Sequence, residues 1–301
     1  MNNKKHYVAA ITAFVIWGFF PILLRALQHY AAGEILYFRI LLSSLILIII
    51  IFGFKRKELL EDRQFYKSLT QKKRVIAVTL TLVGGVLLTG NWLAFIYIVN
   101  SINIKTASFS YLICPVVTAV LGYILLKEKM TVLQWIAVAL CALSCVLMGM
   151  NSLYELGFSF FTAFTYALYL ISQRKNQGFD RMIVLGIQVL FSFLILNITY
   201  TYLIHEIPGD FYFYMLIFII AAIFTVLPLF LNLFALNKIN SATIGILMYI
   251  NPLFNFSIAF LVFGETVNTM QVIGYSIILI ALLLFNYVNL KRILPGSTTQ
   301  A

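Results

Sequence analysis

The chain has 301 residues, of which 62% are hydrophobic and only 10% are charged, and its formal net charge is +11. A soluble protein of this length needs far more charge to cover its surface, so the composition excludes a soluble fold. Apolar runs of about 20 residues follow one another without the alternation of a β-barrel, which predicts an all-α polytopic membrane protein.

Ten apolar runs are each long enough to cross a bilayer as a helix. In chain order they cover residues 7–27, 33–54, 75–99, 106–126, 131–150, 153–173, 182–204, 211–235, 241–263 and 269–290. The basic start of the first run resembles a signal peptide, but the run is too long and lacks a small-residue cleavage site. We therefore interpret it as the first of ten transmembrane helices.

The basic residues gather on one side of the expected membrane. With ten spans, all of the 21 lysines and arginines share the side of the N-terminus except Arg25, Lys105 and Arg39, which lies within a span. The positive-inside rule then places both termini in the cytoplasm, as in a protein of the bacterial inner membrane. This placement argues against nucleic acid as a partner. The loop at 55–74 is expected to lie as a basic strap on the inner leaflet.

Two stretches share a pattern of proline and glutamate. Pro115 and Glu128 in ICPVVTAVLGYILLKEK match Pro252 and Glu265 in INPLFNFSIAFLVFGET. Each proline removes a backbone hydrogen bond, so we expect Pro115 and Pro252 to bend helices that face a shared interior. Each glutamate is expected at the membrane edge, where it favours the N-terminus of the helix that follows.

The match extends to the start of the next helix in each half. TVLQ (131–134) and NTMQ (268–271) both have the pattern of a capping box. The order of these matches predicts two five-helix repeats, 1–150 and 151–291, followed by a short cytoplasmic tail at 292–301. Because five is odd, the second repeat enters the membrane from the opposite side, so the fold is expected to consist of inverted repeats, as in many transporters.

Further motifs carry a family resemblance that covers nearly the whole chain. They are VIWGFFP (15–21), EILYFR (34–39), GNW (90–92), SFSYLICP (108–115), TVLPLF (225–230), SATIGILMYINP (241–252) and FGE (263–265). Together and in order they resemble the EamA family of the drug/metabolite transporter superfamily, in its RarD-like branch. The resemblance implies two EamA-like repeats around a central cavity, and export or exchange of small metabolites or drugs. The chain departs from the family pattern at Phe38 and Gln188, where the family often has titratable side chains.

The candidate substrate-binding residues are aromatic, amide, hydroxyl and cationic side chains within the spans. They are Trp17, Arg39, Asn91, Trp92, Tyr111, Tyr169, Thr225, Asn232, Tyr249 and Asn251. The aromatic rings are suited to stack on a planar or cationic substrate. The amides either face the cavity or join helices through hydrogen bonds. Arg39 either reaches the membrane surface, holds an anionic substrate group or pairs with Glu34.

These features predict a secondary transporter (an exporter, exchanger or facilitator) that moves a small organic metabolite or drug-like solute by alternating access. A lipid flippase is the alternative. An intramembrane enzyme needs acid, base or metal groups that converge within the spans, and the spans supply almost none, so no catalytic residue, metal or cofactor is expected. The expected partners are a small-molecule substrate and membrane lipid, and the sequence does not decide between a monomer and a homodimer.

The acidic residues bear on how transport is driven. All ten fall at span ends or in loops, whereas proton-driven transporters usually carry a titratable side chain within a span. We therefore expect a facilitator or exchanger whose flux follows the substrate gradient.

Overall fold

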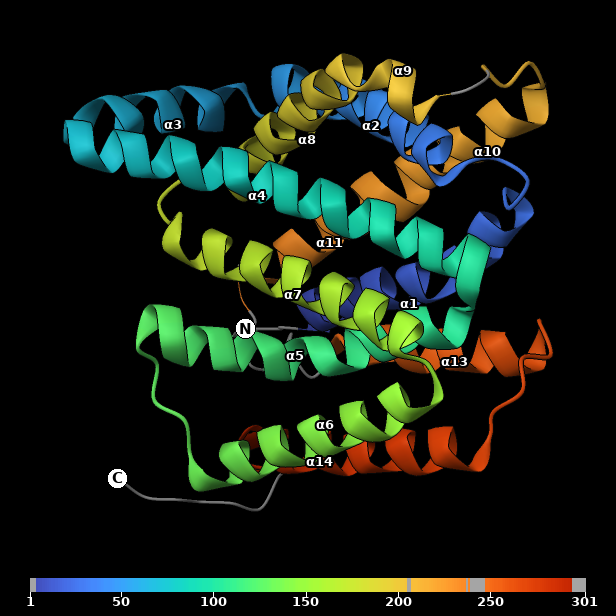
Figure 1. Cartoon of the computed structure of the whole chain (residues 1–301). Helices are drawn as coiled ribbons and strands as arrows, with labels where there is room; N and C mark the ends of the chain where they lie inside the picture. The colour runs from blue at the N-terminus through green and yellow to red at the C-terminus, as the bar shows by residue number, and fades with distance from the viewer. Residues whose placement is uncertain (1–3, 205–206, 237, 239–246, 294–301) are drawn as a thin grey trace.

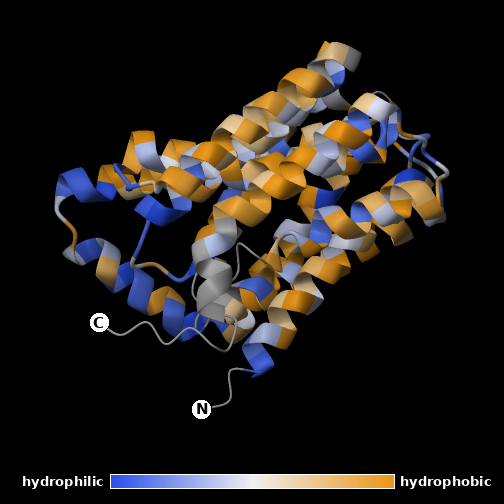
Figure 2. Cartoon of the chain, turned by 90° about the horizontal axis from the view of Figure 1, so that it is seen from below, coloured by the Kyte–Doolittle hydropathy of each residue, from blue (hydrophilic) through white to orange (hydrophobic). Residues whose placement is uncertain are grey.

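The computed structural model describes residues 4–204, 207–236, 238 and 247–293, and in this part of the chain it is helical and has no strand. The axes of most helices lie roughly along one line, left to right in Figure 1. Hydrophobic residues follow the helices and hydrophilic residues gather at the two ends of the bundle (Figure 2). Among the described residues, six helical segments are long and apolar enough to cross a membrane: Lys4–Ala26, Ala32–Phe54, Gln71–Ile102, Ile104–Leu126, Arg181–Ile198 and Phe211–Asn232.

The elements keep the order of the expected spans. They are α1 (Lys4–Ala26), α2 (Ala32–Phe54), α3 (Arg56–Ser68), α4 (Gln71–Tyr97), the π-helical segment η1 (Ile98–Ile102), α5 (Ile104–Leu126), α6 (Val132–Asn151), α7 (Leu153–Lys175), α8 (Arg181–Ile198), α9 (Tyr200–Leu203), α10 (Phe211–Ala221), the π-helical segment η2 (Ala222–Val226), α11 (Leu227–Leu236), α13 (Ile250–Leu261) and α14 (Thr269–Ile293). The expected span at 241–263 and the expected tail at 292–301 lie partly outside the described residues.

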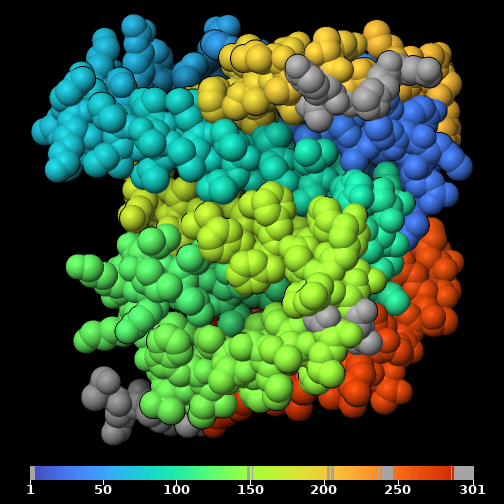
Figure 3. Space-filling model, viewed as in Figure 1, coloured from blue at the N-terminus to red at the C-terminus, as the bar shows by residue number. Residues whose placement is uncertain are grey.

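The segment 55–74, which connects two expected spans, is mostly helix, and its place on the inner leaflet stays a prediction. Its helix α3 has no buried residue, and with the start of α4 it stands out from the rest of the surface (Figure 3). An ion pair and a hydrogen bond join this segment to the loop before α8. The Lys55 ammonium lies 3.0 Å from the Asp180 carboxylate, and the Asp62 carboxylate accepts a hydrogen bond from the Asp180 amide at 3.0 Å.

Gly178 makes the close approach of α3 to this loop possible. Its φ is +99°, and a Cβ added there would lie 2.6 Å from the ring of Phe65. We expect Gly178→Ala to lower the free energy of unfolding by about 1–2 kcal/mol, because it adds a strained backbone and a clash. Thermal unfolding in detergent measures this as a lower melting temperature.

Gly157→Ala in α7 is the matched control, because a Cβ there meets nothing within 4 Å. It is expected to leave stability unchanged or raise it by about 0.5–1 kcal/mol, since alanine is favoured over glycine inside a helix. Equal melting temperatures for the two variants would contradict this account of Gly178.

The helices of the two halves pack in matching pairs. Helix α1 of the first half packs on α11 and α13 of the second half. Helix α7 of the second half packs on α4 and α5 of the first half. Three further pairs join counterparts directly: α2 with α8, α5 with α13, and α6 with α14. Exchanging each helix with the helix at the same place in the other half therefore reproduces the main pairs.

The two capping boxes are confirmed. Before α6, the Thr131 amide donates to the Gln134 side chain at 2.8 Å and the Gln134 amide donates back to the Thr131 hydroxyl at 3.3 Å. Before α14, Asn268 and Gln271 exchange the same two bonds at 3.1 and 2.8 Å. The apolar helix before each box also ends in the same way, because Lys127 and Gly264 both adopt positive φ. Glu128 and Glu265 then each donate a backbone amide six residues back, to Gly122 and Ala259.

The two glutamates do not support the helices that follow them, which corrects the sequence expectation. The Glu265 carboxylate accepts hydrogen bonds from the amides of Ile104 and Lys105 at 2.8 and 3.1 Å, so it caps the N-terminus of α5. It also pairs with Arg25 at the end of α1, at 3.2 Å. Glu128 pairs with Arg174 at the end of α7, at 3.0 Å. We refer to these as the Glu265 end and the Glu128 end of the bundle.

Candidate functional site

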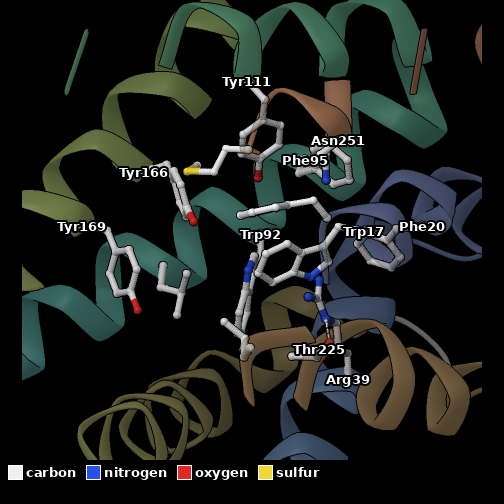
Figure 4. A pocket seen from close by; sticks show the side chains of 14 residues that line it. Trp17, Phe20, Arg39, Trp92, Phe95, Tyr111, Tyr166, Tyr169, Thr225 and Asn251 are labelled. Carbon is white, nitrogen blue, oxygen red and sulfur yellow. Dashed lines mark hydrogen bonds between the residues drawn. The ribbon is translucent and has the colours of Figure 1, made fainter. Parts of the chain in front are cut away.

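A central cavity lies between helices of both halves and contains about 810 Å³ of empty space, including the part open to solvent. The lining side chains are mostly aromatic (Figure 4). They are Phe14, Trp17, Phe20, Arg39, Leu88, Trp92, Phe95, Tyr111, Tyr166, Tyr169, Thr225, Leu229, Met248 and Asn251.

Arg39 is the charged residue of the cavity wall, and its side chain is held on three sides. It is only 3% exposed. Its guanidinium carbon lies 4.9 Å from the ring centroid of Phe20 and 4.5 Å from that of Trp92, and Nε donates to the Thr225 hydroxyl at 2.9 Å. One terminal nitrogen, Nη1, is buried without a hydrogen-bond partner. Within the described residues Arg39 has no ion pair, so the expected alternative of a pair with Glu34 does not occur in this structure.

The π-helical segment η2 presents Thr225 to Arg39. The Thr225 hydroxyl donates to the carbonyl of Ile220 at 2.9 Å and accepts from Arg39. In a regular α-helix the carbonyl of Phe224 accepts from residue 228, but that residue is proline and has no amide hydrogen. Instead the Trp17 indole donates to the Phe224 carbonyl at 3.1 Å, which joins α1 to η2. The proline therefore frees a carbonyl that fixes the orientation of a cavity tryptophan.

Asn91 lies behind the cavity wall and orients Tyr111. It is fully buried, its amide nitrogen donates to the carbonyl of Thr162 at 2.8 Å, and its amide oxygen accepts from the Tyr111 hydroxyl at 3.1 Å. Because the Tyr111 hydrogen is used in this bond, its oxygen is left to accept hydrogen bonds from the cavity side. Asn91 thus joins α4, α5 and α7 and supports the site from outside its lining.

The remaining predicted site residues divide between the cavity and its surroundings. Seven of the ten line it, namely Trp17, Arg39, Trp92, Tyr111, Tyr169, Thr225 and Asn251. Asn232 lies on α11 outside the lining, with a buried amide oxygen that has no hydrogen-bond partner. Tyr249 packs against the cluster that contains Phe109 and Ile278. Whether any of these side chains binds substrate stays a prediction.

The two matched prolines occupy different positions in their helices. Pro115 lies inside α5, whereas Pro252 lies in the first turn of α13. Ahead of Pro252 the chain forms a turn, and the Met248 carbonyl accepts from the Asn251 amide at 3.2 Å. Since Pro252 has no amide hydrogen to give to Met248, the turn supplies the missing donor. This brings Met248 and Asn251 to the cavity wall.

Several lining residues were not among the predicted ones, including Phe20, Phe95 and Tyr166. Phe95 and Tyr166 each lie three positions from a predicted aromatic, Trp92 and Tyr169, and residues three apart share a helix face. That spacing is the signal that would have found them. Figure 4 shows Tyr111 and Tyr166 on one side of the cavity and Arg39 with Thr225 on the other.

An apolar helical bundle around a central aromatic cavity fits a membrane protein, and the comparisons define its class. The model of the EamA-like transporter family matches residues 4–150 and again residues 154–287. The chain therefore belongs to this family, and its homologues include RarD proteins.

Named relatives span nearly the whole chain. An uncharacterized transporter, YojE, of Bacillus subtilis (strain 168) is 29% identical and covers 96% of each chain. Protein RarD of Escherichia coli (strain K12) is 28% identical and covers 94% of each. A protein of known crystal structure is 10% identical and superposes with a TM-score of 0.62 over 95% of this chain and 99% of its own, so the two share a fold.

Proposed function

We propose that this protein is a secondary transporter that moves a small organic solute across the bacterial inner membrane by alternating access around the central cavity. The observation that carries the proposal is the cavity itself, which is lined by helices of both halves and lies where their matched pairs meet. In transporters built from repeats, the site sits at the interface of the repeats and the halves move around it. Membership of a transporter family gives the same class of function.

Three observations support ten spans arranged as two inverted repeats. The family model matches once in each half of the chain. The main helix pairs are reproduced when the halves are exchanged. The counterparts α5 and α13 run antiparallel, because Glu265, just past the end of α13, caps the start of α5. Helices that occupy matching places but point in opposite directions are what an odd number of spans per repeat requires.

A thermal-shift screen of the purified protein against amino acids, amines, organic acids, drugs and lipids tests the proposed function. A ligand that binds the native state raises its apparent stability. Hits among water-soluble solutes, followed by flux of the hit into proteoliposomes, support the proposal. Scrambling of labelled lipid without solute flux would favour a flippase instead.

The proposed topology gives a direct prediction. In a background without Cys114, Cys141 and Cys145, a cysteine at exposed Gly209 is expected to react with an impermeant thiol reagent on intact cells. A cysteine at exposed Lys67 on α3 is expected to react only after lysis, because the basic residues favour the cytoplasmic side. If intact cells react at position 67 and not at position 209, the topology is the inverse of the proposed one.

The position of the carboxylates predicts how flux responds to protons. Glu34, the acidic residue nearest to Arg39 in the sequence, accepts a hydrogen bond from the Ala31 amide at 3.1 Å in the first turn of α2, and it does not line the cavity. We expect an imposed pH gradient at zero membrane potential to leave solute uptake into proteoliposomes unchanged. Accumulation that a protonophore and Glu34→Gln both abolish would contradict this.

A further inference from the structure

We propose that the cavity selects small planar organic anions with a single negative charge, and that Arg39 is the fixed positive charge that binds them. This inference rests on the proposed function and names the substrate class of that site. It follows from the unpaired charge of Arg39, the geometry around its guanidinium and the chemistry of the surrounding wall.

The charge of Arg39 is buried but not neutralised. Arginine stays protonated in proteins, and an isolated charge at membrane depth is costly, so such residues pair with an opposite charge or serve a function. Thr225 is a neutral partner, and none of the ion pairs in the described part of the chain includes Arg39. Among the described residues that line the cavity there is no carboxylate. The missing negative charge is therefore expected to come from the substrate.

The contacts around the guanidinium leave its terminal nitrogens as the groups that can bind a ligand. The ring centroids of Phe20 and Trp92 lie within 4.9 Å of the guanidinium carbon, and Nε donates to the Thr225 hydroxyl. The hydrogen-bond donors that are left for a ligand are therefore on the terminal nitrogens. Nη1 has no hydrogen-bond partner in the part of the protein that the structure describes. A carboxylate matches the edge of a guanidinium because its two oxygens accept from two parallel N–H groups. Figure 4 shows Arg39 beside Thr225, next to Trp17 and Trp92.

The rest of the wall defines the body of the ligand. Trp17, Trp92, Phe95 and Tyr166 present ring faces and edges, which favour a flat apolar or aromatic group. A single buried cation balances one negative charge, whereas a phosphate group at neutral pH leaves uncompensated charge in the cavity. Tyr111 presents an oxygen acceptor on the opposite side from Arg39, so a ligand with an N–H or O–H group at its far end is favoured.

A purely structural role for Arg39 is the competing explanation. Cation–π contacts with two rings contribute to packing. In that case the protein would not distinguish a carboxylate from its uncharged amide. The experiment therefore compares a matched pair of probes, indole-3-acetate and indole-3-acetamide, which share a planar ring and differ in charge.

The test is isothermal titration and thermal shift of the purified full-length protein with each probe. The wild type is expected to bind indole-3-acetate at least about 30-fold more tightly than the amide, the size of effect found when one partner of a desolvated charge pair is removed. Arg39→Met keeps most of the volume without the charge, and it is expected to bind both probes equally weakly. Arg63→Met, on exposed α3, removes the same charge at a distance and is expected to bind like the wild type.

The outcomes separate this inference from the proposed function. If the amide binds as well as the carboxylate, or if folded Arg39→Met keeps the preference, the anion inference is wrong. If neutral or cationic solutes of the wider screen bind and are transported while carboxylates are not, the transporter proposal stands and the inference falls. If no solute of any class binds or crosses, the proposed function itself fails. Arg39→Lys supplies a second variant in case Arg39→Met does not fold, and it is expected to retain charge selection with weaker affinity.

Discussion

In a Glu265→Ala variant, the fraction of molecules whose cavity is open at the Glu265 end is expected to be about 100-fold larger than in the wild type. The Glu265 carboxylate joins three elements there, because it accepts from two amides at the start of α5 and pairs with Arg25 of α1. Its side chain is only 12% exposed. Hydrogen bonds to a charged group contribute about 1.5–3 kcal/mol each, and partial exposure reduces their sum to about 3 kcal/mol, which is roughly 100-fold in a conformational equilibrium.

The measurement is the rate at which an impermeant thiol reagent, added from the Glu265 side, modifies a cysteine placed at Leu229 in the cavity wall. The repeat supplies the control, because Glu128 has the matching position at the other end. The side chains of its pair with Arg174 are 44% and 46% exposed, so Glu128→Ala is expected to change labelling from its own side by less than about fivefold. Equal changes for the two variants would show that Glu265 does not hold its end closed.

A membrane potential is expected to drive accumulation of the transported anion. If the carried species is a monoanion and no proton moves with it, each transport event moves one charge. A potential of about 100 mV then contributes about 2.3 kcal/mol, enough for roughly 50-fold accumulation of indole-3-acetate on the positive side. The assay uses proteoliposomes at equal pH on both sides, with a potassium diffusion potential and radiolabelled probe.

Protein-free vesicles give the leak of the weak acid, and indole-3-acetamide gives the response of an uncharged analogue. Neither is expected to accumulate. Arg39→Met is expected to abolish the potential-dependent part of the uptake, because the fixed charge that selects the anion is gone. Uptake of the carboxylate that ignores the potential and follows a pH gradient would instead indicate that a proton is carried with it.

Local features of the fold were predictable from the sequence because their partners are close in the chain. The capping boxes at Thr131 and Asn268 need only a side chain and an amide three residues apart. The membrane class follows from hydropathy, since backbone polar groups in lipid must be satisfied within each helix. The 55–74 segment was predicted as a basic connection between two spans, whereas its helix α3 was not predicted.

Features that depend on distant partners were not predictable in this way. Glu265 precedes α14 in sequence, but it caps α5, which lies far earlier in the chain. Asn91 and Tyr249 carry the residue types of a binding site, yet the rotation of α4 about its axis and the turn before α13 place them beside the cavity lining. The π-helical turn at Thr225 has no signal in the spacing of apolar residues, although Pro228 marks the carbonyl that it frees.

The distribution of tryptophan has a practical consequence for spectroscopy. The chain has three tryptophans, and two of them, Trp17 and Trp92, line the cavity. The third, Trp135, is 43% exposed on α6, beside Tyr123. A Trp135→Phe chain would therefore emit only from the two cavity indoles. Any solute that displaces water from these indoles or stacks on them would change the wavelength or intensity of the emission. Binding in the cavity could therefore be followed by intrinsic fluorescence without an added label.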